Sequence, residues 1–306
     1  MVSARRHRRV MHKKRVSWNP ILKYLVLILI PLIAFLFVRL TTKHWNGKDK
    51  VSVVFQKSGG DVGLTLLDPK LKEITTFTIP GNTEVEVARN LGSLKIQNIW
   101  QLGMNEKLGG GLLAQTVTKD FLFPTVLWTG SVGESLSDGN FVEILKFIFT
   151  RKDTNIAFGD RVSIGIFVLK ARSNEKSDIN LGKSQFLVKA KLSDGSLGYK
   201  IPGEISERIT FYFSDNDFSQ TGIKIYIKDS TGKFGVAERV GQIVEVMGGK
   251  VVNLEKGPDE ESDCSIWGQN ESAVKKISKI FGCKVTNEKS DFDVQISLGT
   301  TFAKRF

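Results

Sequence analysis

The longest apolar run of the chain lies near its start. Residues 21–40 are 20 positions of which only Lys23 and Arg39 are charged. About 20 apolar residues span a hydrocarbon core roughly 30 Å thick, and both charged side chains lie where their long stems reach the interface. The run is longer than the roughly 7–15-residue core of a cleaved signal peptide, and no small-x-small cleavage pattern follows it. The pattern predicts a transmembrane helix over residues 21–40 that stays attached to the rest of the chain.

Beyond residue 50 the apolar positions change to short segments, separated by turns rich in glycine, proline and aspartate. Alternation of apolar and polar residues predicts strands, and apolar residues three and four positions apart predict helices. We expect strands at 51–55, 62–67, 74–79, 161–169, 184–192 and 209–213, and helices at 112–121 and 141–149. These elements indicate a mixed α/β central domain over residues 50–215, whose strand order the pattern leaves open.

The last 85 residues have the clearest periodicity. We expect strands at 223–227, 250–254, 264–267, 284–286 and 292–298, and amphipathic helices at 236–247 and 273–281. Residues 247–251 (MGGKV) align with residues 281–285 (FGCKV) at an offset of 34. This βαβ–βαβ order predicts a C-terminal two-layer α/β sandwich over residues 222–306.

Positive charge is concentrated at the start of the chain. Residues 1–50 carry six Arg and six Lys against the single Asp49, a net charge of +11, so the other 256 residues carry 32 basic and 31 acidic groups, a net charge of +1. A basic tail beside a membrane helix is typical of topology setting and of contact with anionic headgroups. We therefore expect residues 1–20 in the cytoplasm and residues from about 45 onward outside it. The neutral body argues against a nucleic-acid partner.

Few residues can supply catalytic or metal chemistry to the exported part. The three histidines, His7, His12 and His44, lie in the tail or next to the predicted membrane helix. This placement excludes Ser–His–Asp and Cys–His nucleophile schemes and a histidine metal site from the body. Two cysteines, Cys264 and Cys283, are too few for a four-cysteine zinc site. An oxidising compartment permits a disulfide between them, and free buried thiols are the equally weighted alternative.

Residues 222–302 resemble the C-terminal domain of bacterial LytR proteins. The resemblance rests on the turn at 229–232 (DSTG), on 235–237 (GVA) at the start of a helix, and on 291–299 (DFDVQISLG). The family's turn is typically similar to Asn-Gly-Thr-Gly, and this chain has Asp229-Ser230 where Asn-Gly is usual. The resemblance implies a LytR-type C-terminal domain over residues 222–306.

Residues 51–128 resemble the start of the LytR-CpsA-Psr catalytic domain, through the stretches 67–69 (LDP), 78–83 (TIPGNT), 95–98 (KIQN) and 110–123. In that family such a domain lies outside the membrane on one N-terminal helix, and it transfers undecaprenyl-diphosphate-linked polymers onto the cell wall. A site of this kind needs guanidinium groups to orient two phosphates and carboxylates to hold Mg²⁺.

The charged members of this family pattern are missing from the chain. Gly81 and Asn82 stand where the family's Ile-Pro-Arg-Asp-Thr has Arg and Asp. Asp61 lies near the place of the family's metal-binding Asp, and Arg161 and Arg172 lie near the place of downstream arginines, so these three are only weak catalytic candidates. The resemblance thus implies a degenerate relative, with Mg²⁺ as a cofactor only if transferase activity is retained.

We therefore expect a single-pass, extracytoplasmic binding or scaffold protein of the cell envelope, without catalytic activity and without a cofactor. Its expected partners are membrane lipids, with a cell-wall polymer or envelope proteins as further candidates. One alternative is an active transferase of undecaprenyl-diphosphate-linked glycopolymers. A second alternative is a membrane-tethered regulator that acts on DNA through its basic tail.

Overall fold

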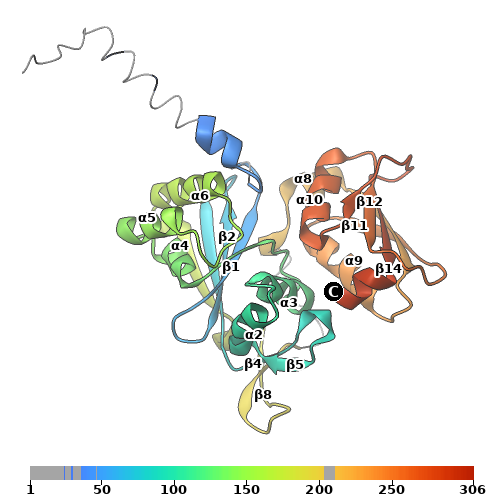
Figure 1. Cartoon of the computed structure of the whole chain (residues 1–306), viewed down its shortest axis with the longest axis horizontal. Helices are drawn as coiled ribbons and strands as arrows, with labels where there is room; N and C mark the ends of the chain where they lie inside the picture. Colours follow the sequence, from blue (N-terminus) through green and yellow to red (C-terminus); the bar gives the residue numbers. More distant parts are fainter. Residues whose placement is uncertain (1–23, 25–28, 30–35, 46, 203–210) are drawn as a thin grey trace, which may run out of the picture.

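The computed structural model describes residues 24, 29, 36–45, 47–202 and 211–306 (Figure 1). The predicted basic tail at 1–20 and most of the predicted membrane helix at 21–40 lie outside these described residues. Among the residues that are described, no helix has the length and apolar character needed to cross a membrane. Residues 36–41 are helical and lead into the first strand of the body.

A five-stranded mixed sheet lies at the centre of the first part of the chain, in the order β6-β1-β2-β3-β7. Its strands are β1 (Val51–Gln56), β2 (Val62–Asp68), β3 (Glu73–Ile79), β6 (Leu127–Thr129) and β7 (Lys176–Asn180). Neighbours β1, β2 and β3 are antiparallel, whereas β6 and β7 pair in parallel with β1 and β3. The β1–β2 turn contains Gly60 at φ +88°, a left-handed conformation that glycine adopts without steric cost.

Helices cover both faces of this first sheet (Figure 1). The covering helices are α3 (Gly111–Phe121), α5 (Phe141–Phe149) and α6 (Phe158–Lys170). Successive strand side chains point to opposite faces, so Val54 and Phe77 pack in the cluster that contains α3, whereas Val53 and Ile74 pack with α5 and α6. The first part of the chain is therefore a three-layer arrangement with a buried sheet.

A small four-stranded sheet, in the order β5-β4-β9-β8, adjoins the first one. Its strands are β4 (Thr83–Glu86), β5 (Ser93–Lys95), β8 (Val188–Lys191) and β9 (Leu197–Lys200). The remaining short elements of this part are α2 (Ile99–Asn105), α4 (Ser135–Asp138), η1 (Ala88–Asn90), η2 (Ile96–Asn98), η3 (Ser131–Glu134), η4 (Ser173–Glu175) and η5 (Leu181–Lys183). The β8–β9 hairpin lies at the opposite end of the molecule from helical residues 36–41 (Figure 1).

The C-terminal residues form a third sheet, in the order β11-β10-β14-β12-β13. Its elements are β10 (Lys224–Ser230), α9 (Val236–Val246), β11 (Lys250–Lys256), β12 (Cys264–Trp267), α10 (Glu271–Phe281), β13 (Lys284–Val285), β14 (Val294–Gly299) and α11 (Thr300–Arg305), preceded by α8 (Asn216–Thr221). Only β12 and β14 are antiparallel neighbours, and the other pairs are parallel. The strands and helices expected between 223 and 298 are confirmed, within a few residues at their ends.

Two expected strands are wrong. Residues 161–169 belong to helix α6, and the described end of the 209–213 segment, residues 211–213, is helical. A short apolar run does not distinguish a strand from a buried helix by periodicity alone. Helix α6 is favoured by its packing: a Cβ on Gly165 would lie 2.7 Å from the Ile148 side chain, so α5 and α6 approach closely at this glycine. Within the segment 184–192, only Val188–Lys191 is a strand.

Candidate functional site

A cavity of about 360 Å³ lies between segment 42–52, the first sheet and helix α10. Its apolar walls include Trp45, Val51, Leu66, Val126, Leu127, Phe213, Met247 and Ile280. Five lysines and two aspartates also line it: Lys43, Lys50, Lys275, Lys276, Lys279, Asp49 and Asp215, so lysines outnumber carboxylates. We refer to it as the lysine-lined cavity. Apolar walls combined with a few charged groups are typical of ligand sites, and the sign of these groups favours an anion with an apolar part.

Three of the five lysines are neutralised by neighbouring carboxylates. The pairs are Lys275–Glu271 (2.9 Å), Lys50–Asp68 (3.1 Å) and Lys276–Asp215. Among the described residues, no carboxylate forms an ion pair with Lys43 or Lys279. Nζ of Lys279 instead lies 3.4 and 3.5 Å from the carbonyl oxygens of Lys43 and His44. Lys43 and Lys279 are therefore the two cations of the cavity that an anionic ligand could neutralise.

One buried carboxylate holds the chain segment that forms the cavity wall. Asp160, in the first turn of α6, is fully buried. Its two carboxylate oxygens accept hydrogen bonds from the backbone N–H groups of Lys43, His44 and Trp45, at 3.0–3.3 Å. Trp45 is itself buried and packs edge-on against Phe167 at 5.8 Å. The segment between the predicted membrane helix and β1 is thus fixed to α6, which positions Lys43 beside α10.

His44 contributes no positive charge to this cavity at neutral pH. Burial lowers the pKa of His44; Asp160 opposes this shift, and Lys279 and Lys43 add to it. Its Nδ1 is buried without a hydrogen-bond partner within the described part of the chain. Because the ordinary histidine pKa is about 6.5, a lowered pKa leaves the ring neutral at pH 7. The positive charge at the cavity therefore comes from its lysines.

Asp61, one of the three weak catalytic candidates, has a structural role in a turn. Its Oδ1 accepts a hydrogen bond from the backbone N–H of Gly81 at 2.8 Å, and its carbonyl accepts one from Lys57 N–H at 2.8 Å. No lysine or arginine in the described ranges forms an ion pair with it. A Cβ on Gly81 would lie 2.6 Å from the Gly60 carbonyl oxygen and 2.9 Å from Gln97 Oε1. The turn at Gly81 is therefore closed by backbone, and position 81 has no room for a side chain.

Arg161 and Arg172 lie at the far end of the first sheet from Asp61. Asp61 adjoins the turn of the β1–β2 hairpin, whereas Arg161 follows Asp160, which holds the chain just before β1. Arg172 precedes β7, whose first residue pairs with the start of β3 at that same far end. Strand β1 extends for about 20 Å between the two ends, at roughly 3.3 Å per residue. The structure does not bring the three candidates together.

Arg161 also differs from a phosphate-binding arginine in its surroundings. It is 7% exposed, lies 5.9 Å from the ring centre of Phe158, and has a buried Nε without a hydrogen-bond partner among the described residues. Burial lowers its pKa, and the nearby Arg151 lowers it further. Asn82 lies in the turn just before β4, where its amide donates to the Leu197 carbonyl at 3.4 Å.

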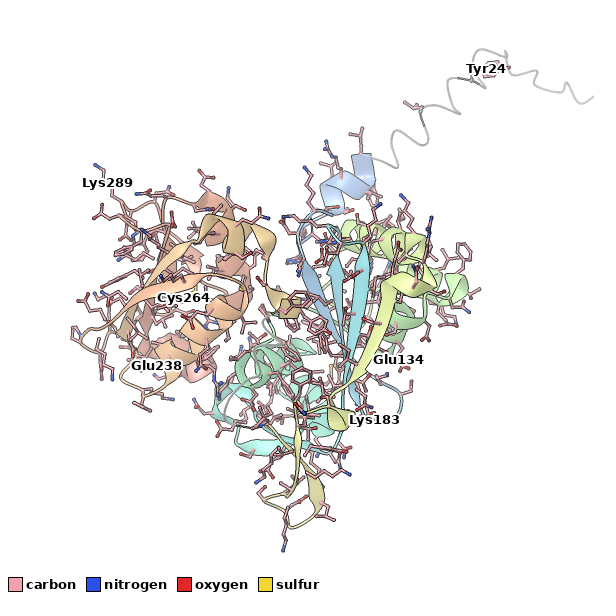
Figure 2. All side chains as sticks on the ribbon, turned by 180° about the vertical axis from the view of Figure 1, so that it is seen from behind. Tyr24, Glu134, Lys183, Glu238, Cys264 and Lys289 are labelled. Carbon is pink, nitrogen blue, oxygen red and sulfur yellow. A yellow bond between two sulfur atoms is a disulfide. The ribbon has the colours of Figure 1, made fainter. Side chains whose placement is uncertain are left out.

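The two cysteines are joined in the structure. Cys264 begins β12 and Cys283 follows α10, and they form a disulfide with their Cα atoms 4.7 Å apart (Figure 2). The bond fastens α10, which carries three of the cavity lysines, to the C-terminal sheet. For the described residues, no group of three or more His, Cys, Asp or Glu side chains could hold a metal ion.

Sequence reasoning missed the lysine-lined cavity. The lysines of α10 look like the solvated face of an amphipathic helix, and nothing in the periodicity relates them to Lys43. The one sequence feature that bears on it is segment 42–50, which contains three lysines and a tryptophan next to the predicted membrane helix.

No protein-family model matches this chain, and no curated protein matches it either. Several solved structures of LytR-CPS2A-Psr family proteins are similar to it. B. subtilis TagT is 16% identical, with a TM-score of 0.36 over 53% of this chain and 88% of TagT. B. subtilis TagV is 13% identical, with a TM-score of 0.36 over 51% of this chain and 92% of TagV. YwtF (TagT) with bound octaprenyl pyrophosphate lipid is 15% identical, with a TM-score of 0.36 over 52% and 87%. Similarity at this level does not support a function for this chain, so any function has to be argued from its own residues.

Proposed function

We propose that this chain is a single-pass, membrane-anchored binding or scaffold protein of the cell envelope, exposed outside the cytoplasm and without transferase activity. In this proposal residues 21–40 are the anchor, residues 50–215 a degenerate LytR-CpsA-Psr-like domain, and residues 222–306 a LytR-type two-layer α/β sandwich. Its ligands are membrane or lipid-linked anions, with a wall polymer or an envelope protein as further partners.

The absence of transferase activity is proposed from the position of Asp61. Its carboxylate closes the turn at Gly81 through a 2.8 Å hydrogen bond instead of facing a cation. The two candidate arginines lie a strand length away, so neither of them faces that carboxylate. Loss of one such electrostatic contact costs about 2.7–4 kcal/mol of transition-state stabilisation, a rate loss of about 10²–10³-fold.

The binding part is supported by the lysine-lined cavity. It combines a volume of about 360 Å³, apolar walls and two cations, Lys43 and Lys279, that form no ion pair with any described carboxylate. A lysine ammonium binds phosphate as a point charge and needs no fixed fork geometry. Such a site suits binding and contains no arrangement for bond cleavage.

The extracytoplasmic placement is supported by the Cys264–Cys283 disulfide, because disulfides persist in oxidising compartments and are rare in the cytosol. The basic tail and the apolar run at 21–40 support the same topology through the positive-inside rule. Protease treatment of intact and lysed cells tests it: degradation of residues 50–306 in intact cells is expected. Protection in intact cells with degradation only after lysis would contradict the topology.

The ligand test uses the full chain in detergent micelles, with a polyprenyl diphosphate and Mg²⁺ as the probe. Binding is followed by tryptophan fluorescence, because Trp45 lines the cavity. Turnover is followed by release of polyprenyl phosphate from a lipid-linked glycopolymer. We expect saturable binding without turnover.

The variant Lys43→Gln/Lys279→Gln is expected to bind about tenfold or more weakly, since a hydrogen bond to a charged group contributes roughly 1.5–3 kcal/mol. Lys284→Gln/Lys289→Gln is the charge-matched control; Lys289 points away from the body at the outer side of the C-terminal sheet (Figure 2). Turnover by the wild-type chain would establish the transferase alternative. Equal weakening in both variants would remove the cavity as the site, and absence of both binding and turnover would leave protein scaffolding as the function.

A further inference from the structure

Helices α5 and α6 present large apolar side chains to solvent. Phe149 is 67% exposed and Phe141 60% exposed. The other exposed members are Val142 and Leu145 on α5, and Ile166 and Leu169 on α6. We call these six side chains the apolar patch. Exposed apolar groups gathered on neighbouring helices mark an interaction surface, whereas scattered single ones are ordinary.

The patch is continuous with the end of the predicted membrane helix. Phe149 packs against Phe158 with ring centres 6.2 Å apart, and Phe158 packs against Phe37 at 5.8 Å. Phe37 belongs to helical residues 36–41, where Leu36 and Leu40 are also exposed. The backbone of this helix lies so close to Gly159 that a Cβ there would overlap the Val38 carbonyl oxygen. Aromatic contacts therefore link residues 36–41 to α6 at Phe158 and, through it, to Phe149 of α5.

The charge around the patch is positive. Segment 141–172 contains six basic residues and three acidic ones, a net charge of +3 in a body whose net charge is +1. The basic residues are Lys146, Arg151, Lys152, Arg161, Lys170 and Arg172, and the acidic ones are Glu143, Asp153 and Asp160. Asp160 and Arg161 are both buried, so their charges do not act at the surface, and the other five basic and two acidic residues keep the net charge of +3. Apolar side chains beside Lys and Arg are the composition of helices that lie in a membrane interface.

We propose that the apolar patch docks on the membrane surface, so that α5 and α6 lie in the headgroup region of an anionic bilayer beside the anchor. The inference rests on the membrane anchor of the proposed function and adds a second, peripheral contact to it. Docking fixes the orientation of the body, since one helix alone leaves the body free to rotate about the point where residues 36–41 leave the bilayer. A second copy of the chain is a poorer occupant, because a two-fold contact brings two positively charged surfaces together.

The test measures how deeply the patch lies in lipid. The full chain is placed in vesicles of phosphatidylcholine with about one-third phosphatidylglycerol, which supplies the anionic surface. Because its two cysteines form a disulfide, a single reactive thiol can be introduced as Phe149→Cys and labelled with an environment-sensitive fluorophore. The matched control is Leu197→Cys, an 82% exposed position on the β8–β9 hairpin at the opposite end of the molecule (Figure 1). Nitroxide lipids with shallow labels then quench whatever lies in the headgroup region.

We expect the label at position 149 to be quenched at least about twofold more than the label at position 197, and its quenching to fall in vesicles of phosphatidylcholine alone. Equal quenching at the two positions, in protein that resists carbonate extraction, would overturn the docking and leave the anchor intact. A label at 149 that is shielded from water but not quenched by lipid would also overturn it, in favour of a second copy. Quenching at 149 in protein that carbonate extracts would support the docking while contradicting the anchor.

Discussion

Asp160 is predicted to be the residue that couples the anchor segment to the folded body. The substitution Asp160→Asn keeps the shape of the side chain and removes its charge and one of its two accepting oxygens. In the structure, three backbone N–H groups share these two oxygens through five contacts of 3.0–3.3 Å, and the carboxylate is fully buried. An asparagine at this place accepts fewer of them and presents an amide donor to another donor.

The expected loss follows from these contacts. A hydrogen bond to a charged group contributes about 1.5–3 kcal/mol net, and a buried donor left without an acceptor costs about 1–3 kcal/mol. Because the three donors compete for two oxygens, we expect a total loss of about 2–4 kcal/mol in the free energy of unfolding, with part of it expressed as local release of residues 42–50.

The assay is urea unfolding of the full chain in detergent, followed by tryptophan fluorescence, together with limited proteolysis at residues 42–50. Release of this segment exposes Trp45, so red-shifted emission and faster cleavage are expected before global unfolding. Asp153→Asn is the matched control, because Asp153 is exposed and adopts φ +54°, where asparagine is tolerated. A loss in Asp160→Asn no larger than the loss in Asp153→Asn would refute the role given to the buried carboxylate.

Three further predictions concern stability. Cys264→Ala/Cys283→Ala is expected to lower the free energy of unfolding by about 3 kcal/mol, from the loop entropy of a 19-residue separation. Reduction of the wild type is expected to cause the same loss, and a reduced wild type that stays as stable as the oxidised one would contradict this cause. Burial raises the pKa of Asp120 to about 6, although the hydrogen bond that its carboxylate accepts from the backbone N–H of Glu86 lowers it. Because the folded pKa of Asp120 lies above the unfolded value of 3.8, the stability that this group contributes is present below pH 4 and is lost as pH rises through 6. Asp120→Asn should therefore remove about 1 kcal/mol of the stability loss measured between pH 5 and 7.5. An unchanged pH dependence of stability in this variant would refute the prediction. Gly81→Arg is expected to destabilise by about 1–3 kcal/mol without creating turnover, whereas Gly59→Ala, which meets no atom within 4 Å, should be neutral in the same urea titration.

Periodicity alone predicted most of the elements. The strands near residues 51–79 and the repeated strand–helix–strand units after residue 223 were predicted from short apolar runs and helical spacing. The order and direction of the strands near residues 51–79 were not predicted, because these strands are buried on both faces and their side chains do not mark one side of a sheet. Glycine-rich turns between the elements were also predicted from local sequence, and turn glycines such as Gly60 adopt positive φ in the structure. The charge division between tail and body was also a property of the sequence alone.

Helix α6 and the candidate site needed the tertiary structure. The run at 161–169 is apolar enough for either element, and the close approach of α5 at Gly165 decides for the helix. Asp61 resembled a metal ligand in the sequence, yet its partner is a backbone N–H twenty residues away. The cations of the lysine-lined cavity are 236 residues apart in the chain, at Lys43 and Lys279. Sequence spacing reports neighbours along one helix or strand, whereas a cavity is made where separate elements pack, and only the packing brings such charges together.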